Sequence, residues 1–339
     1  MTTKKKPFLN LKEIIVFAVI AATFCILGFV TKKGSTLTFL SRVILVALYA
    51  LALNIQFGYG GMINLGSALY FGMSGYLIII FVARLGIPLW LAIIMTLAIE
   101  VAFATLFGYI TLKRGMMTFM FLNMGICQLL ATFISKTTTL GGQTGLMANV
   151  CPAWLADKQV KFFVILGVGV LCGALLYLLT KSPLIASLKG ARDNRERLTF
   201  LGVNTNKLLL VVFVISSFFM GIAGILYVLL YNSISTTQMS ADISLQALLM
   251  CVMGGSTTFI GPIVGAVMIL CFNTYMPKIT HQTQLFMGVL MLIFIYFIPQ
   301  GLIDPKNKVV RVTADFFRKL FRKKGPKTAE DAVQEGKEG

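Results

Sequence analysis

Two long stretches with almost no charge restrict this chain more than any other feature. Residues 43–83 contain no Asp, Glu, Lys or Arg, and residues 208–303 contain only Asp242 and Lys278. A helix that crosses a bilayer needs about 20 predominantly apolar residues. Both stretches are long enough for more than one crossing, and a water-soluble domain could not bury so much apolar surface in one core. The sequence therefore predicts a polytopic membrane protein.

The apolar runs predict an all-α membrane helix bundle with about 8–10 transmembrane helices, some of them short or broken. We expect spans at residues 14–30, 39–57, 65–82, 89–110, 116–134, 160–179, 208–231, 243–255, 259–275 and 285–299. The first apolar run is followed by Lys32 and Lys33 and lacks a small-residue cleavage site, so we expect an uncleaved first helix.

The positive charges are unevenly distributed over the loops. If the amino terminus lies inside, the inner side of the membrane collects 22 of the 30 Lys and Arg residues. This asymmetry follows the positive-inside rule and predicts that both termini face the cytoplasm. It also accounts for the net charge of +18 without nucleic acid as a partner. The lipid bilayer is the partner that the composition requires.

Charge density divides the chain into three parts. Residues 1–12 form a basic cytoplasmic terminus, residues 13–305 the transmembrane domain, and residues 306–339 a basic tail. Within the tail, Phe316, Phe317, Leu320 and Phe321 share one helical stripe among cations. Such a stripe fits a helix lying on the inner membrane surface, but a solvated charge run fits it equally well. The last residues are polar, and we expect them to be disordered.

The sequence offers little for catalysis. His281 is the single histidine, no GxxxxGK[ST] phosphate loop is present, and the six cysteines lie mostly inside apolar runs without a CxxC pair. Histidine pairs, phosphate loops and clustered thiols are what metal, ATP and disulfide chemistry require. We therefore expect no catalytic, cofactor-binding or metal-binding residues in this chain.

Glu100 is the one carboxylate near the middle of a predicted span. An ionisable side chain at that depth is a functional candidate by default. The alternative is a structural role, in which the carboxyl is hydrogen-bonded inside the bundle or faces a partner subunit. One residue is thin evidence for proton coupling, which usually relies on chains of buried acidic or histidine side chains.

Glycine-rich segments interrupt the apolar runs at two places. Residues 54–66 (NIQFGYGGMINLG) and 253–262 (MGGSTTFIGP) each join two apolar segments. Irregular backbone at membrane depth is tolerated where protein buries it or where it lines a wet cavity. The candidates for lining the translocation pathway or for close helix packing are Gly58, Gly60, Gly61, Asn64, Gly66, Glu100, Gly254, Gly255 and Gly261. Spacing alone does not decide between these two roles.

Six stretches occur in an order that resembles the permease subunits of bacterial branched-chain amino acid ABC transporters. They are residues 54–76 (NIQFGYGGMINLGSALYFGMSGY), 140–146 (LGGQTGL), 190–204 (GARDNRERLTFLGVN), 218–227 (FFMGIAGILY), 253–266 (MGGSTTFIGPIVGA) and 298–303 (IPQGLI). Each stretch alone is weakly specific, whereas the ordered set across residues 42–303 is strong.

The resemblance implies a fold, a location and a set of partners. The fold would be similar to the second class of ABC importer membrane domains, in the bacterial cytoplasmic (inner) membrane. The partners would be two cytoplasmic ATPase subunits, a second permease subunit and an extracytoplasmic substrate-binding protein. ATP hydrolysis would drive transport from the partner chains, and the substrates would be leucine, isoleucine or valine.

The inner loop 184–206 is the segment expected to couple ATP hydrolysis to transport. Pro183 begins a new segment, and Ile185, Leu188, Arg192, Arg195 and Thr199 follow at helical spacing, with Gly202 as the cap. Such charge density usually marks a solvated turn. The resemblance of ARDN and LGVN to the family's coupling segment instead favours docking in a groove of the ATPase. The residues expected there are Arg192, Asp193, Asn194, Arg195, Glu196 and Gly202.

Three other functions fit part of the sequence. A related permease for urea or short amides would share the family's motifs. A stand-alone secondary transporter or channel would explain the broken helices, but it would leave the charged inner loop without a role. A membrane enzyme would need paired acids, an activated nucleophile or a metal cluster at membrane depth, and the sequence shows none clearly.

Overall fold

The computed structural model describes residues 19, 22–29, 34–142, 144–152, 155, 157–278, 282, 285, 286, 288, 289 and 292. About half of the first predicted span (14–30) and most of the last one (285–299) lie outside these residues. The predicted basic terminus 1–12 and the tail 306–339 lie outside them entirely.

Six of the described helices are long and apolar enough to cross a membrane. They are α2 (Gly34–Asn54) with a π-helical turn to Tyr59, α3 (Ser67–Ile79) with a π-helical turn to Arg84, α4 (Leu89–Leu112), α5 (Met116–Lys136), α6 (Lys158–Thr180) and α9 (Thr205–Tyr231). Each begins and ends within a few residues of a predicted span, so the predicted polytopic all-α fold is confirmed.

Two further apolar helices are short, as the interrupted pattern predicts. α10 (Ala241–Gly254) and α11 (Gly261–Tyr275) have 14 and 15 residues. At 1.5 Å per residue each is about 21–22 Å long, which is less than the hydrocarbon thickness of about 30 Å. The other described elements include α7 (Pro183–Asp193), α8 (Arg195–Phe200) and two short antiparallel strands, β1 (Leu146–Met147) and β2 (Ser233–Ile234). Three 3-10 turns cover Thr138–Leu140, Thr236–Met239 and Met276–Lys278.

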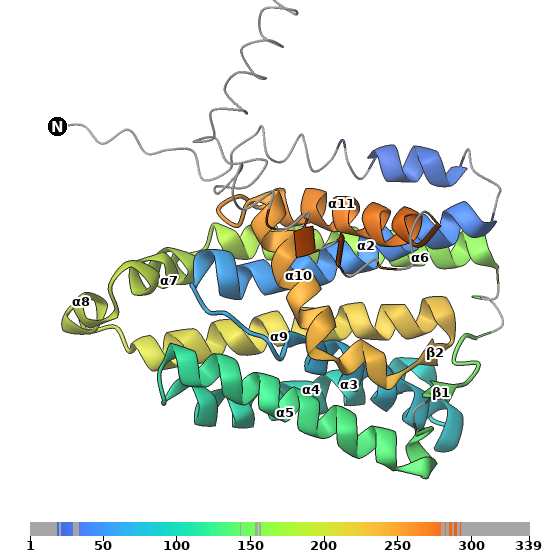
Figure 1. Cartoon of the computed structure of the whole chain (residues 1–339), viewed down its shortest axis with the longest axis horizontal. Coiled ribbons are helices and arrows are strands. Elements are labelled where there is room, and N and C mark those ends of the chain that lie inside the picture. The colour runs from blue at the N-terminus through green and yellow to red at the C-terminus, as the bar shows by residue number, and fades with distance from the viewer. Residues whose placement is uncertain are drawn as a thin grey trace, which may run out of the picture.

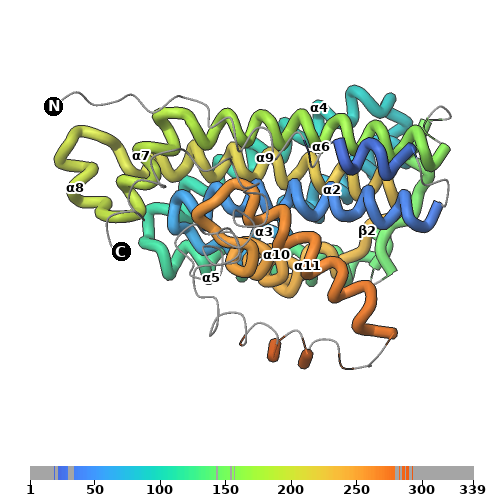
Figure 2. The backbone as a smooth tube through the Cα atoms, turned by 90° about the horizontal axis from the view of Figure 1, so that it is seen from above, coloured from blue at the N-terminus to red at the C-terminus, as the bar shows by residue number. Residues whose placement is uncertain are grey.

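The long helices run along a common direction and leave different elements at the two ends of the bundle (Figures 1 and 2). α7 and α8 project at one end, which we call the α8 end. Gly60, Gly61 and Met116 lie at the same end, beside residues of α7 and α8. The strands lie at the opposite end, which we call the β end. Arg84 donates there to the carbonyl of Thr139, which ties the loop after α3 to the loop after α5.

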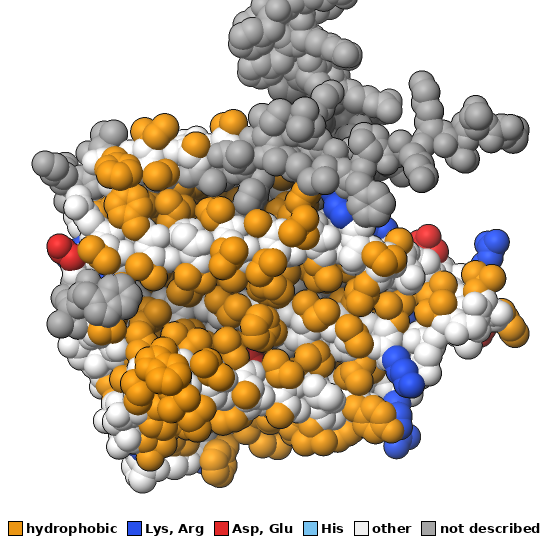
Figure 3. All heavy atoms as spheres, turned by 180° about the vertical axis from the view of Figure 1, so that it is seen from behind, with side chains coloured by type: hydrophobic (Ala, Val, Ile, Leu, Met, Phe, Trp, Pro, Cys, Tyr) orange, Lys and Arg blue, Asp and Glu red, His pale blue; other side chains and the backbone are white. Residues whose placement is uncertain are grey.

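The core lies between α2, α3 and α9. Tyr70 on α3 is fully buried and meets Phe213 of α9 edge-on, with ring centroids 5.5 Å apart. α4 and α5 instead expose many large apolar side chains, among them Trp90, Ile94 and Phe121. Figure 3 shows hydrophobic side chains covering the flank of the bundle, while most charged side chains gather at its ends. This is the surface of a multi-pass membrane protein, whose flank contacts lipid.

Candidate translocation pathway and coupling segment

The first glycine-rich segment is irregular, and side chains satisfy its backbone. After the π-helical turn Ile55–Tyr59, Gly61 takes a left-handed φ of +66°, which side chains with a Cβ rarely adopt. Asn64 Nδ2 donates to Gln56 Oε1 (3.0 Å), and Gly66 N–H donates to Asn64 Oδ1 (3.0 Å). Gln56 and Asn64 are fully buried. The protein interior therefore supplies the hydrogen bonds that lipid could not supply.

The second glycine-rich segment packs against the first. α10 ends at Gly254, the next residue Gly255 has a φ of +108°, and the chain turns before α11 begins. Asn54 Nδ2 donates to the carbonyl oxygen of Thr258 (3.5 Å), and a Cβ added to Gly58 would overlap the carbonyl oxygen of Ser256. The two interruptions, which are almost 200 residues apart in the chain, form one junction of broken helices.

Several of the predicted glycines allow backbones to approach closely. A Cβ on Gly66 would overlap the backbone of Asn123 in α5, and Gly254 and Gly261 lie against each other across the α10–α11 turn. These contacts agree with the packing role of small residues in membrane helices. A role of the same residues in the translocation pathway stays a prediction.

The predicted coupling segment is two helices and not one. The helix expected to run through Arg192, Arg195 and Thr199 ends at Asp193, so the prediction of a continuous helix is wrong. Asn194 is extended (φ −157°, ψ 110°), and its Oδ1 accepts the Arg197 N–H (2.9 Å), which caps α8. Short polar side chains compete in this way with the helical backbone for hydrogen bonds. The predicted cap is confirmed: Gly202 has a φ of +84°, and its N–H donates to Thr199 O (2.9 Å).

The coupling segment is fastened to the first glycine-rich segment. α7 buries Ile185 and Leu188 against the bundle, and the Arg192 guanidinium donates to the carbonyl oxygen of Gly58. An open groove of about 570 Å³ lies between the two segments. Its lining joins both predicted sets of residues: Gly60, Gly61, Met116, Ala191, Arg192, Asp193, Asn194, Arg195 and Glu196. Nothing in the sequence indicated that these two sets meet.

The tip of the coupling segment exposes two large apolar side chains that were not among the predicted coupling residues. Phe200 is 89% exposed and Leu201 is 74% exposed, beside the charged residues of α8. The sequence signal for their exposure was their position directly before Gly202, the predicted cap at the end of the segment. Partial burial lowers the pKa of the Arg195 guanidinium, which still stays charged because arginine is not deprotonated in proteins.

Glu100 has neither of the two structural surroundings that the sequence suggested. Its side chain is fully buried within this chain, so it does not face a partner subunit. Neither carboxyl oxygen has a hydrogen-bond partner among the described residues, and the same is true of the Tyr70 hydroxyl and of Thr96 Oγ1. The carboxyl group lies against the backbone of Gly221 in α9, where an added Cβ would overlap it.

A signal for this burial is present in the sequence of α4. Small or polar residues occur at every fourth position (Ala92, Thr96, Glu100, Ala104 and Gly108), and most of the other residues are large and apolar. All five face the interior. In a membrane helix, small residues mark the face that packs against other helices.

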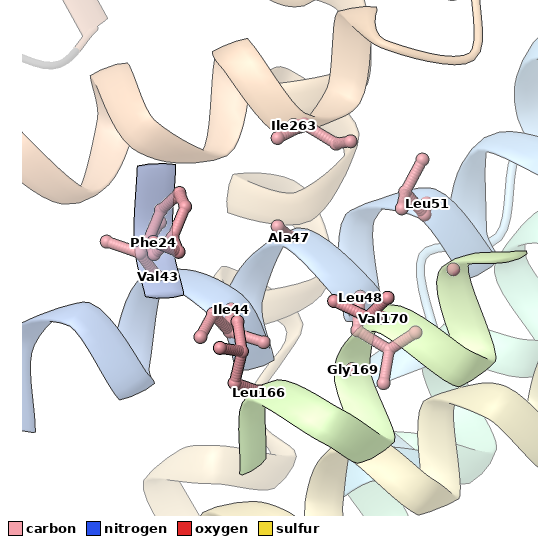
Figure 4. Close-up of a pocket in the computed structure, with 11 residues that line it drawn as sticks. Phe24, Val43, Ile44, Ala47, Leu48, Leu51, Leu166, Gly169, Val170 and Ile263 are labelled. Atoms are coloured by element: carbon pink, nitrogen blue, oxygen red, sulfur yellow. The ribbon is translucent and has the colours of Figure 1, made fainter. Parts of the chain in front are cut away.

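An apolar cavity of about 60 Å³ lies between α2 and α6 (Figure 4). Ala47, Leu48, Leu166 and Val170 are among its lining residues, and all the side chains lining it are apolar. Such a wall offers nothing to an ammonium or carboxylate group. Among the described residues, no group of three His, Cys, Asp or Glu side chains could hold a metal ion.

A family model described as the permease component of the branched-chain amino acid transport system matches residues 35–297. Two relatives carry the name high-affinity branched-chain amino acid transport system permease protein LivM. The one from Salmonella typhimurium is 22% identical and the one from Escherichia coli is 21% identical, each over 89% of this chain and 76% of the relative. No solved structure matches. The resemblance drawn from the six stretches is confirmed.

Proposed function

Because this chain belongs to the family of permease components of branched-chain amino acid transport systems, we propose that it is a membrane subunit of an ATP-driven importer of leucine, isoleucine and valine. It pairs with a second permease subunit to form the pathway. Two cytoplasmic ATPase subunits drive it, and an extracytoplasmic binding protein delivers the substrate. The names of the two LivM relatives support the substrate class.

The observation that carries the proposal is the projecting coupling segment. α8 exposes Phe200 and Leu201 among charged residues at the end of the bundle. Exposed apolar side chains ringed by charges are typical of a protein interface. In this proposal the α8 tip docks in a groove of an ATPase subunit, with Asp193, Arg195 and Glu196 at the rim.

The orientation follows from the same segment. The α8 end faces the cytoplasm, where the ATPase subunits lie, and the β end faces outward. The concentration of Lys and Arg on the predicted inner side supports this orientation, since 22 of 30 lie there. Residues 1–12 and 306–339 are then cytoplasmic on either side of the membrane domain 13–305.

The contacts of Arg192 provide a route for the coupling. The Arg192 guanidinium holds the Gly58 carbonyl, and Leu188 is buried in the same α7 face. A displacement of α7 by the ATPase therefore acts directly on the glycine-rich junction. Arg192 accordingly connects α7 to the bundle, while Asp193, Arg195 and Glu196 make the contacts with the ATPase.

Cross-linking tests the docking. With Arg195→Cys, the permease should cross-link to an ATPase subunit in the assembled complex. Gly202→Asp should leave the permease inserted but should uncouple ATP hydrolysis from amino acid uptake. Gly86→Asp is the matched control, because Gly86 also has a positive φ (+65°) with open space around it, but it lies at the β end. Normal uptake by Gly202→Asp, or absence of any cross-link, would refute the docking.

Two other functions are separated by one uptake series. A permease for urea or short amides would carry those solutes in an ATP-dependent manner and not leucine. A secondary transporter would accumulate solute without the ATPase subunits and would depend on an ion gradient. Uptake of labelled leucine, valine and urea, with and without the ATPase subunits, distinguishes the three functions.

A further inference from the structure

Arg42 lies well inside the length of its helix, and its side chain is exposed at the surface of the bundle. It lies eight residues into α2. At 1.5 Å per residue that is about 12 Å along the helix. Among the described membrane helices, Arg42 and Glu100 are the two charged residues more than two turns from either helix end. A cation at such a position marks a substrate or ion pathway by default.

Arg42 has no acidic partner within the described part of the chain. The nearby ionisable groups are the phenols of Tyr227 and Tyr231, which lie close enough to feel its charge. A guanidinium carries five N–H donors in a planar fork that matches a carboxylate. The charge of Arg42 therefore remains available to an anionic group that comes from outside the chain.

A cavity of about 70 Å³ lies beside Arg42, where α10 and α11 close against α2. Its polar part contains three amides besides the guanidinium: Gln238, Gln246 and Asn273. Asn273 Nδ2 donates to Gln246 Oε1 (3.1 Å), which leaves the Gln246 N–H groups and Asn273 Oδ1 for other partners. Its apolar wall includes Leu45, Ile243 and Met250.

The aromatic side of the cavity is fixed in place. Tyr49 lines it, and the Tyr49 hydroxyl is hydrogen-bonded to Ser67 Oγ (2.7 Å) in the core. Phe71 packs between Tyr49, to which it is tilted, and Tyr227, which it meets edge-on, with ring centroids 5.3 and 5.5 Å away. Aromatic faces of this kind attract a cationic group through the ring quadrupole.

We propose that this cavity is the point in the membrane pathway where the substrate is recognised, and that Arg42 binds the α-carboxylate of an aliphatic amino acid. Asn273 Oδ1 and the aromatic faces receive the ammonium group, and the apolar wall contacts the aliphatic side chain. This inference rests on the proposed function. It adds a recognition site to a pathway for which the sequence offered only glycines.

The cavity is too small to hold an amino acid as it stands. At about 70 Å³ it is much smaller than ordinary small-molecule sites, which hold about 300–1,000 Å³. An amino acid therefore enters only when the α10–α11 pair moves away from α2.

Transport by the reconstituted complex tests the role of Arg42. Arg42→Gln should lower the maximal uptake rate of leucine by about tenfold or more, because the carboxylate loses its charged partner. The KM for the loaded binding protein should stay unchanged. Arg42→Lys should retain most of the rate, and Lys136→Gln, which removes an exposed cation at the β end, should behave like the unmodified chain.

Chemical rescue separates charge from folding. Arg42→Cys should be inactive, should regain uptake after reaction with 2-aminoethyl methanethiosulfonate, and should not regain it after reaction with methyl methanethiosulfonate. The unmodified chain, treated with both reagents, controls for the six native cysteines.

Each outcome bears on one proposal. If the unmodified complex takes up no leucine, the proposed function fails. If that complex is active and Arg42→Gln stays within about twofold of it, or if the two reagents restore Arg42→Cys equally, the recognition site is refuted.

Discussion

The contact between Glu100 and Gly221 makes a specific prediction about stability. Gly221→Ala would place a methyl group inside the van der Waals radius of the Glu100 carboxyl. Overpacking of this kind costs about 1–3 kcal/mol, and the better helix propensity of alanine offsets less than about 1 kcal/mol. We therefore expect Gly221→Ala to lower the free energy of unfolding by about 1–2 kcal/mol.

Removing the carboxyl should relieve the clash. The double variant Glu100→Ala, Gly221→Ala should be more stable than the sum of the two single effects predicts, by about 1–3 kcal/mol. Glu100→Ala by itself leaves a cavity, but it also removes two carboxyl oxygens without hydrogen-bond partners among the described residues, so its own effect is small for a buried site.

The assay is SDS-induced unfolding in mixed micelles, followed by circular dichroism. Gly125→Ala is the matched control, since it makes the same change on a helix where nothing lies near the added Cβ. If Gly221→Ala unfolds like Gly125→Ala, or if the two single effects simply add, the carboxyl does not lie against Gly221.

Three further predictions concern the glycine-rich junction and the buried acid. Gly61→Val and Gly255→Val should cut leucine uptake, because a positive φ costs a residue with a side chain about 1–2 kcal/mol. Gly61→Asn should retain more activity, because asparagine adopts a left-handed φ more readily. Equal uptake by all three variants would contradict this. Asn64→Leu should lower the free energy of unfolding by about 1–3 kcal/mol, because the Gly66 N–H loses its acceptor; an unchanged SDS midpoint would contradict it. Glu100→Gln should leave uptake and its pH dependence unchanged, and a selective loss of pH-dependent uptake would instead favour ion coupling.

The sequence predicted where the helices begin and end better than it predicted which helices pack against each other. Span boundaries follow from hydropathy, which depends on composition along the chain, and for this reason α4 and α6 begin and end close to the expected residues. In a membrane, lipid-facing side chains are as apolar as core side chains, so hydropathy does not mark the buried face, and in α4 only the spacing of small residues indicates it. The contact of Glu100 with α9 could therefore not be derived from hydropathy.

Glycines gave local information but little long-range information. The pattern identified Gly61, Gly202 and Gly255 as special, and all three have positive φ. Nothing in the spacing indicated that Arg192 reaches the Gly58 carbonyl, because that contact joins segments that are more than 130 residues apart. The break at Asn194 was missed for a different reason: helical spacing on both sides of it outweighed the capping preference of a single amide.

The tight turn between α10 and α11 limits which parts of the bundle can move. Gly254, Gly261 and Gly265 place backbone directly on backbone, without side chains between the two helices that could slide or change rotamer. Such a joint has few internal degrees of freedom. The pair should therefore travel as one rigid wedge whose hinges lie beyond it, in the turns before Ala241 and after Tyr275. A disulfide within the pair should leave transport intact, whereas one that staples the pair to α2 should stop it.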